Sequence, residues 1–227
     1  MRMSDFYLFP SYYEWVDFLN WLDLIKGRRS VSYFTDRQVE SKKIAAILEA
    51  GRWAPSPLNS QPWDFTVLSD KKSIARLIES GEYKKTSKNV PLAIAVVLKP
   101  AKINNAGVKR KTLRPEDSFM SVGIAAYSMC LAAQSMGVAS HLLTPSYSSA
   151  RKELKLKKGA KMPIMVALGY EDKKDKRKAG KRKSLKKIVK FQNSPARFGI
   201  KDLLEMSLGS GKFGSFAHDD DERMPGV

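Results

Sequence analysis

Two short stretches of the sequence combine guanidinium and hydroxyl side chains that could bind an anion. They are GRRSVS, with Arg28, Arg29, Ser30 and Ser32, and KRKSL, with Arg182. A guanidinium group can bind phosphate through paired hydrogen bonds, and hydroxyls suit a polyhydroxyl chain. Because arginine and serine also cluster on ordinary solvated surfaces, the pattern alone leaves open whether these stretches form a site.

A third stretch, RWAPSPLNSQPW (residues 52–63), joins a helix-like run to a strand-like run. Pro55 and Pro57 restrict its backbone, while Ser56 and Asn59 offer hydrogen bonds. One interpretation is a helix stop followed by a turn, and the other is a stiff loop that holds a flat ligand. The stretch by itself does not decide between them.

Side chains for acid–base or metal chemistry are scarce. The chain has two histidines, His141 and His218, and one cysteine, Cys130, which lies in an apolar run. No His/Cys cluster has metal-ligand spacing, and neither GxxxxGK[ST] nor GxGxxG occurs. We therefore predict no metal site and assign no catalytic residue; if the protein is an enzyme, a cofactor supplies the chemistry.

Composition limits the protein class and its partners. A chain of 227 residues can bury a full core, and its net charge of +18 is concentrated in residues 151–161 and 171–190. These basic runs could attract polyanions, but they lack the interleaved aromatics of a base-reading module, so a solvated surface is favoured over a nucleic-acid site. The single cysteine, the absence of a long apolar run and the broken N-terminal pattern predict a cytoplasmic protein without a membrane span.

Helix-like and strand-like patterns alternate along the chain and predict layers of helices around one sheet. Asp36 is expected to cap the second helix, and residues 101–117 are expected to form a loop. We predict helices over residues 11–26, 39–51, 71–81, 118–137 and 148–157, and strands over residues 64–70, 90–100, 138–145 and 162–170.

The order of these motifs resembles the FMN-dependent nitroreductase family. The resemblance covers roughly residues 20–190 and is carried by GRRSVSYF, APSPLNSQPWDFTVL, GVASHLLTP, and VALGY followed by GKRKSLKKIV. It implies an α+β fold, a three-layer α/β/α sandwich with a central mixed sheet, that works as an intertwined homodimer. We divide the chain into an N-terminal arm (1–19), a nitroreductase-like FMN-binding domain (20–193) and a C-terminal extension with an acidic tail (194–227).

The resemblance also implies cofactor contacts, position by position. They are Arg28, Arg29, Ser30 and Ser32 at the phosphate, ribityl chain and pyrimidine edge; Pro55, Ser56, Pro57 and Asn59 at the flavin of the partner subunit; Leu142, Leu143 and Thr144 beside the isoalloxazine ring; and Arg182 at the phosphate. Lys88 corresponds more loosely to a lysine that touches the pyrimidine carbonyl in some members.

The sequence departs from the family pattern at informative positions. Ser32 stands where the family often has arginine, and Glu171 follows Tyr170 where the family has proline. The nearest pattern is the branch of dehalogenating iodotyrosine enzymes, but GEYKKTSKN is too short for their substrate lid. Deiodination is therefore not the predicted reaction.

The activity implied is NAD(P)H-dependent, FMN-mediated transfer of two electrons to nitroaromatic, quinone or similar acceptors in ping-pong order. Two alternatives stay open at this point. One is a specialised flavin enzyme that dehalogenates or fragments a defined metabolite. The other is a non-enzymatic flavin-binding or nucleic-acid-binding protein that uses the basic residues 151–190.

Overall fold

The computed structural model describes residues 21–81, 87–99, 114–178 and 180–190. The chain divides into two units, Met1–Ala179 and Gly180–Val227, and the described part of the second contains the short helix α7 (Leu185–Ile188). The predictions for the N-terminal arm, for most of the 101–117 loop and for the C-terminal extension lie outside the described residues.

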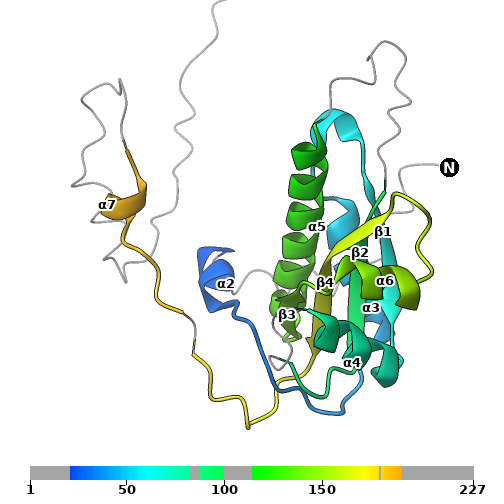
Figure 1. Cartoon of the computed structure of the whole chain (residues 1–227). Helices are drawn as coiled ribbons and strands as arrows, with labels where there is room; N and C mark the ends of the chain where they lie inside the picture. The colour runs from blue at the N-terminus through cyan, green and yellow to red at the C-terminus, as the bar shows by residue number, and fades with distance from the viewer. Residues whose placement is uncertain (1–20, 82–86, 100–113, 179, 191–227) are drawn as a thin grey trace, which may run out of the picture. The chain divides into compact units, whose positions relative to one another are not determined.

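The first unit contains one four-stranded sheet with the order β1-β2-β4-β3 (Figure 1). Its strands are β1 (Trp63–Leu68), β2 (Leu92–Leu98), β3 (Ala139–Leu143) and β4 (Lys161–Gly169). Neighbouring strands pair antiparallel, and parallel pairing among the described residues is confined to isolated bridges such as Ser30–Ser140.

The strand register defines two ends of this sheet. At the proximal end β2 and β3 begin and β4 ends, since Leu92 lies opposite Leu168 and Ala139 lies opposite Gly169. At the distal end β1 begins, β2 ends and β4 begins. A sequence motif that directly precedes or follows one of these strands can therefore be placed at the proximal or the distal end of the sheet.

Helices cover both faces of the sheet, which confirms the predicted three layers. On one face, α3 (Ser41–Arg52) and α5 (Pro115–Ser135) share a core with β2, and α2 (Trp21–Gly27) packs against α5. On the other face lie α4 (Lys71–Ser80) and α6 (Tyr147–Glu153). Every residue of β2 is buried, as expected for a central strand covered on both sides.

The long helix α5 approaches the sheet closely because small residues occupy its buried face. Ala125, Ala126 and Ala133 are fully buried there. Cys130 is also buried, as predicted, and burial raises the pKa of its thiol. The thiol is therefore a small apolar packing group.

Two predicted helix starts were wrong. Asp36 does not cap α3, which begins at Ser41 after an N-cap residue without a side-chain hydrogen bond; Asp36 instead forms an ion pair with Lys71 at 2.7 Å. Helix α5 begins at Pro115, inside the segment predicted as a loop. Proline suits a first helical turn because it has no N–H to satisfy, and Asp117 completes a capping box there.

Gly169, at the end of β4, is required by its surroundings. A Cβ atom there would lie 2.9 Å from the ring of Phe34 and 2.9 Å from that of Pro91. We expect Gly169→Ala to lower the free energy of unfolding by about 1–3 kcal/mol because both neighbours are rigid. Urea denaturation followed by circular dichroism measures this difference.

Gly123→Ala is the matched control, since a Cβ atom on this α5 residue meets nothing within 4 Å. Alanine is the better helix former, so this variant should be as stable as the wild type or more so. Equal stability of Gly169→Ala and the wild type would contradict the packing assigned to Gly169.

Candidate functional site

Residues 28–35, here called the anchored segment, cross the proximal end of the sheet. Its main chain bonds to three separate parts of the fold: Val31 N–H to Ser140 O (3.1 Å), Lys88 N–H to Ser32 O (2.7 Å) and Thr35 N–H to Tyr170 O (2.8 Å). The GRRSVS motif is thus fixed against the starts of β2 and β3 and the end of β4. Its side chains emerge from a backbone with little freedom to move.

The two arginines of the motif have different surroundings. The Arg28 Nη1 atom is buried and has no hydrogen-bond partner among the described residues. Arg29 donates through Nη2 to the Glu171 carboxylate, and its Nη1 lies 3.7 Å from Asp175 Oδ1. Arg29 Nη1 is likewise buried without a hydrogen-bond partner among the described residues. A buried cationic donor without a hydrogen bond is costly, so both nitrogens fit an anionic ligand such as a phosphate, and Arg29 differs in that it is also paired with carboxylates.

Asp175 is a buried carboxylate that sequence reasoning missed. Its Oδ2 accepts hydrogen bonds from the Ser32 and Tyr33 amides, and its Oδ1 accepts from the Arg177 amide at 2.9 Å. Burial alone would raise the pKa of Asp175, but these amide hydrogen bonds and the nearby Arg177 charge lower it below its ordinary value. The only signal in the sequence was a carboxylate within a run of lysines.

Tyr170 of the LGY motif links the anchored segment to α3. Its carbonyl accepts from Thr35, and its hydroxyl donates to Glu40 and accepts from Lys43 at 3.0 Å. The guanidinium of Arg37 lies 3.9 Å from the centre of its ring. The motif therefore has a positioning role that the sequence alone did not reveal.

His141 forms a buried pair with Ser87 on the other side of the anchored segment. Ser87 Oγ lies 2.7 Å from His141 Nδ1, and the ring also bonds to the Val31 backbone. Burial and the charges of Arg177 and Arg28 lower the pKa of His141 to about 4, so the ring is neutral at pH 7. Its second hydrogen bond is to the backbone rather than to a carboxylate, so these residues do not form a catalytic triad.

The predicted ring-contacting residues lie at the far end of β3. Leu142 and Leu143 point to opposite faces of the sheet, and Thr144 is exposed just beyond them. Ser140, which bonds to the anchored segment, precedes Thr144 by four residues of extended chain, or about 13 Å. Strand β3 thus contacts the anchored segment near its start and leads to Leu142, Leu143 and Thr144 at its end.

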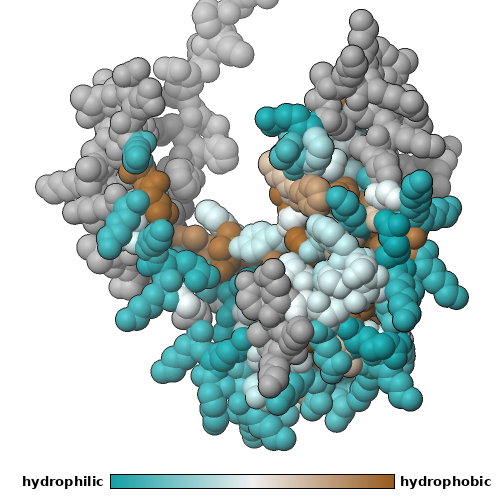
Figure 2. Space-filling view, in the orientation of Figure 1, coloured by the Kyte–Doolittle hydropathy of each residue, from teal (hydrophilic) through white to brown (hydrophobic). Residues whose placement is uncertain are grey.

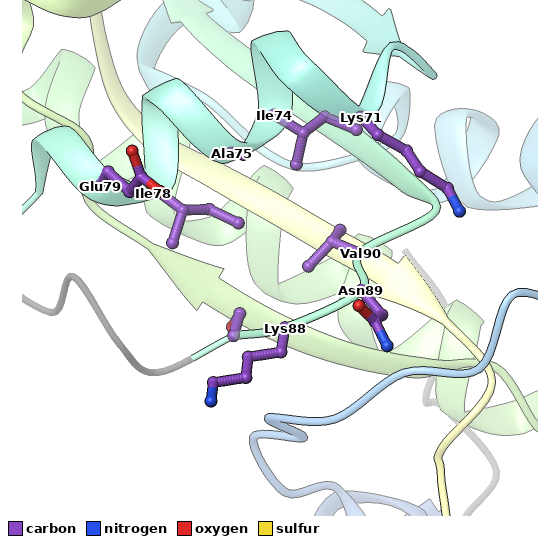
Figure 3. A pocket seen from close by; sticks show the side chains of 9 residues that line it. Lys71, Ile74, Ala75, Ile78, Glu79, Lys88, Asn89 and Val90 are labelled. Atoms are coloured by element: carbon purple, nitrogen blue, oxygen red, sulfur yellow. The ribbon is translucent and has the colours of Figure 1, made fainter.

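A pocket of about 540 Å³ lies beside the anchored segment, between α4 and residues 87–90 (Figure 3). Ile74, Ile78 and Val90 face its interior, while Lys71 and Lys88 extend at its edges. The Lys88 ammonium also lies 5.6 Å from the centre of the Tyr33 ring. Glu79 also lines the pocket and Lys71 is paired with Asp36, so Lys88 is the cation at the rim that would suit an anionic or electron-rich edge of a ligand.

The proline-rich loop lies at the distal end of the sheet, since it leads into Trp63 at the start of β1. Its short helix η2 (Pro57–Asn59) packs against α5. The nine residues of β4 span the sheet between the two ends, about 25 Å. Within one chain, Pro55, Ser56, Pro57 and Asn59 are therefore not brought together with Arg28.

This loop holds an uncommon backbone conformation. Leu58, Asn59 and Gln61 have φ values of 54°, 51° and 42° without being glycine. Ser56 Oγ accepts from the Gln61 amide at 2.9 Å, and Gln61 Nε2 donates to Asn59 Oδ1 at 3.0 Å. The polar side chains thus fix the shape of the loop, and such strain is characteristic of functional loops.

Comparison with known proteins identifies the family. The model of the Nitroreductase family matches residues 25–170. The chain belongs to the nitroreductase family. An Archaeoglobus fulgidus protein named "Putative NADH dehydrogenase/NAD(P)H nitroreductase" is 29% identical over 68% of this chain and 87% of its own length.

Solved structures of this family share the fold. An FMN-dependent nitroreductase from Clostridium difficile R20291 is 25% identical, with a TM-score of 0.61 over 76% of this chain and 99% of its own. A Desulfovibrio desulfuricans structure, named "putative nitroreductase in complex with FMN", is 25% identical, with a TM-score of 0.62 over 78% and 99% of the two chains. The family resemblance, the α+β nitroreductase-like fold and the prediction of a flavin-dependent oxidoreductase are confirmed.

Other predictions for this nitroreductase-family chain stay predictions. Arg182 belongs to the second unit, where its Nη1 donates to Gly180 O at 2.8 Å. The basic residues of α6 and the following turn are exposed, as Arg151 and Lys158 illustrate. Within the described ranges, no helix is long and apolar enough to cross a membrane, and no cluster of three potential metal ligands occurs.

The lowered pKa of His141 predicts a pH dependence of stability. The unfolded chain binds a proton near the ordinary histidine pKa, but the folded chain does so only near pH 4, so stability falls as the pH drops between these values. From pH 7 to pH 5, the wild type should lose about 1–2 kcal/mol more unfolding free energy than His141→Asn, which cannot titrate. Urea denaturation at each pH measures the unfolding free energy. If the wild type and His141→Asn lost the same amount between pH 7 and pH 5, His141 would not be buried as a neutral ring.

Proposed function

We propose that this protein is an FMN-dependent oxidoreductase that uses NAD(P)H to reduce nitroaromatic, quinone or similar electron-poor acceptors. The observation that carries the proposal is the buried, unpartnered Nη1 of Arg28 on a segment fixed at the end of the sheet. Family membership and the named cofactor and reductant of its relatives support the same activity.

The described residues fit a flavin mononucleotide. Arg28 would bind the phosphate, because its buried Nη1 has no hydrogen-bond partner among the described residues and would gain one from an anionic oxygen. Ser30 and Ser32 would line the ribityl chain and pyrimidine edge, and residues 142–144 would lie beside the ring. The 13 Å or so between Ser140 and Thr144 suits so elongated a ligand.

When bound, FMN supplies two-electron chemistry between NAD(P)H and the acceptor, for which we propose ping-pong order. The protein's own side chains would bind and orient the cofactor and the substrates. His141 is neutral and hydrogen-bonded on two sides, and Asp175 is held by three amides, so neither is free to exchange protons with a substrate. Protons would then come from solvent, which agrees with the scarcity of acid–base side chains in the sequence.

We propose further that the site is completed by a second copy of the chain. Arg28 and Asn59 belong to opposite ends of one sheet, but a twofold-related copy can bring its distal loop to the other's anchored segment. Helix α5 offers an apolar contact surface, since Figure 2 shows hydrophobic surface over its upper part. Met120 and Tyr127, seven residues apart, are 53% and 37% exposed.

The cofactor proposal predicts a flavin absorbance spectrum for the purified protein. Anaerobic NADH or NADPH should bleach it, and a nitroarene or quinone should restore it. Arg28→Ala should weaken FMN binding roughly 10- to 100-fold, because it removes a charge-assisted contact. Arg182→Ala should weaken it as well, if the second unit supplies the predicted phosphate contact.

Lys26→Ala, which removes an exposed cation two residues before Arg28, serves as the control and should retain full flavin content. A colourless protein that gains nothing from added FMN would disprove the cofactor proposal. Unchanged FMN affinity in both arginine variants would disprove the phosphate assignment alone.

The dimer proposal predicts a particle of twice the 25.5 kDa chain mass in sedimentation velocity. Met120→Glu combined with Tyr127→Glu should shift the protein toward monomers and lower its FMN content, because charges would be buried at the contact. Lys72→Glu on α4, which lies on the opposite face of the sheet, should leave both unchanged. A monomeric wild type with full flavin content would contradict the second-copy site.

A further inference from the structure

We propose that Asp175 is a positioning residue of the cofactor site: its buried carboxylate sets the conformation of the GRRSVS backbone. The inference deepens the proposed function and rests on it. It concerns a residue that lies outside the matched family region of residues 25–170.

The geometry is that of an anion bound by backbone amides. The Asp175 side chain is 0% exposed, and its Oδ2 accepts from two successive amides, Ser32 and Tyr33. The same residue is held in place by the Arg177 amide on Oδ1 and by its own N–H, which donates to Asp172 O at 2.9 Å. A carboxylate enclosed in this way fixes the peptide planes of the segment that binds it.

Two carboxylates distinguish the two arginines of the motif. Arg29 lies between Glu171 and Asp175, so its guanidinium ties the turn after β4 to the anchored segment. Arg28 Nη1 and Arg29 Nη1 are both buried without a hydrogen-bond partner among the described residues. Glu171 and Asp175 thus hold the Arg29 guanidinium against the turn after β4, whereas Arg28 has no such ion pair among the described residues.

Ser32 anchors the motif through its main chain. The small Ser32 is 6% exposed, and its amide is directed at Asp175 while its carbonyl accepts from Lys88. Both groups belong to the main chain, so any residue except proline could supply them at this position. The anchoring of the motif therefore depends on a carboxylate about 140 positions later in the chain.

Asp175→Asn tests the assignment because asparagine offers one acceptor oxygen where aspartate offers two. Either the Ser32 and Tyr33 amides or the Arg177 amide must then face an NH₂ group. We expect FMN affinity to fall at least tenfold in a fluorescence titration of apoprotein. Asp172→Asn is the matched control, since its carboxylate accepts from the Lys174 amide within the same turn and the charge change is identical.

Nuclear magnetic resonance of wild-type apoprotein gives a test that needs neither a folded variant nor activity. The amide protons of Ser32, Tyr33 and Arg177 should resonate downfield and exchange slowly, as expected for bonds to a buried carboxylate. In Asp175→Asn these signals should move upfield, whereas in Asp172→Asn they should stay.

The outcomes separate the two proposals. A wild type that binds no FMN overturns the proposed function. A wild type that binds FMN, with equal affinity in Asp175→Asn, overturns the positioning role and leaves the function standing. Ordinary, rapidly exchanging amide signals for Ser32 and Tyr33 in the wild type also overturn it, even if Asp175→Asn fails to fold.

Discussion

The main-chain pairing of residues 28–35 across the proximal end of the sheet is the interaction on which the site depends. Backbone groups of Ser140 in β3, of Lys88 before β2 and of Tyr170 after β4 find their hydrogen-bond partners in this segment. The cost of ordering GRRSVS is thereby offset before a ligand arrives, so binding energy is not spent on fixing the loop. Gly169 permits the crossing because Phe34 occupies the space that a larger residue at position 169 would need.

Electrostatics distinguishes the two adjacent arginines of the motif. Carboxylates from the turn after β4 pair with Arg29, whereas Arg28 has no ion pair among the described residues, and both side chains keep a buried Nη1 without a hydrogen bond. Unsatisfied buried cations are costly, which makes the Arg28 position a reservoir of binding energy for an anion. The buried neutral His141 adds no charge to this region at pH 7, so the arginines dominate the local field.

The GRRSVS motif and the proline-rich loop lie at opposite ends of the sheet, which is the basis of the second-copy proposal. An antiparallel sheet of this length separates its ends by about 25 Å, which no single loop of the described chain spans. The loop at the distal end is held in its uncommon conformation by its own hydrogen bonds, with positive φ values at Leu58, Asn59 and Gln61. The proposed twofold arrangement would bring the two motif groups together between two copies of the chain.

The sequence by itself determined the layers, the buried Cys130 and the family, because apolar periodicity and the order of short motifs are local properties. The predicted starts of α3 and α5 were wrong. Asp36 pairs with the distant Lys71 instead of capping α3, and α5 begins at Pro115, where a capping box forms. Only the tertiary structure paired Arg29 with a carboxylate and showed the contacts of Asp175 and Tyr170. Those contacts join residues more than a hundred positions apart, and burial, which decides their strength, exists only once the chain is folded.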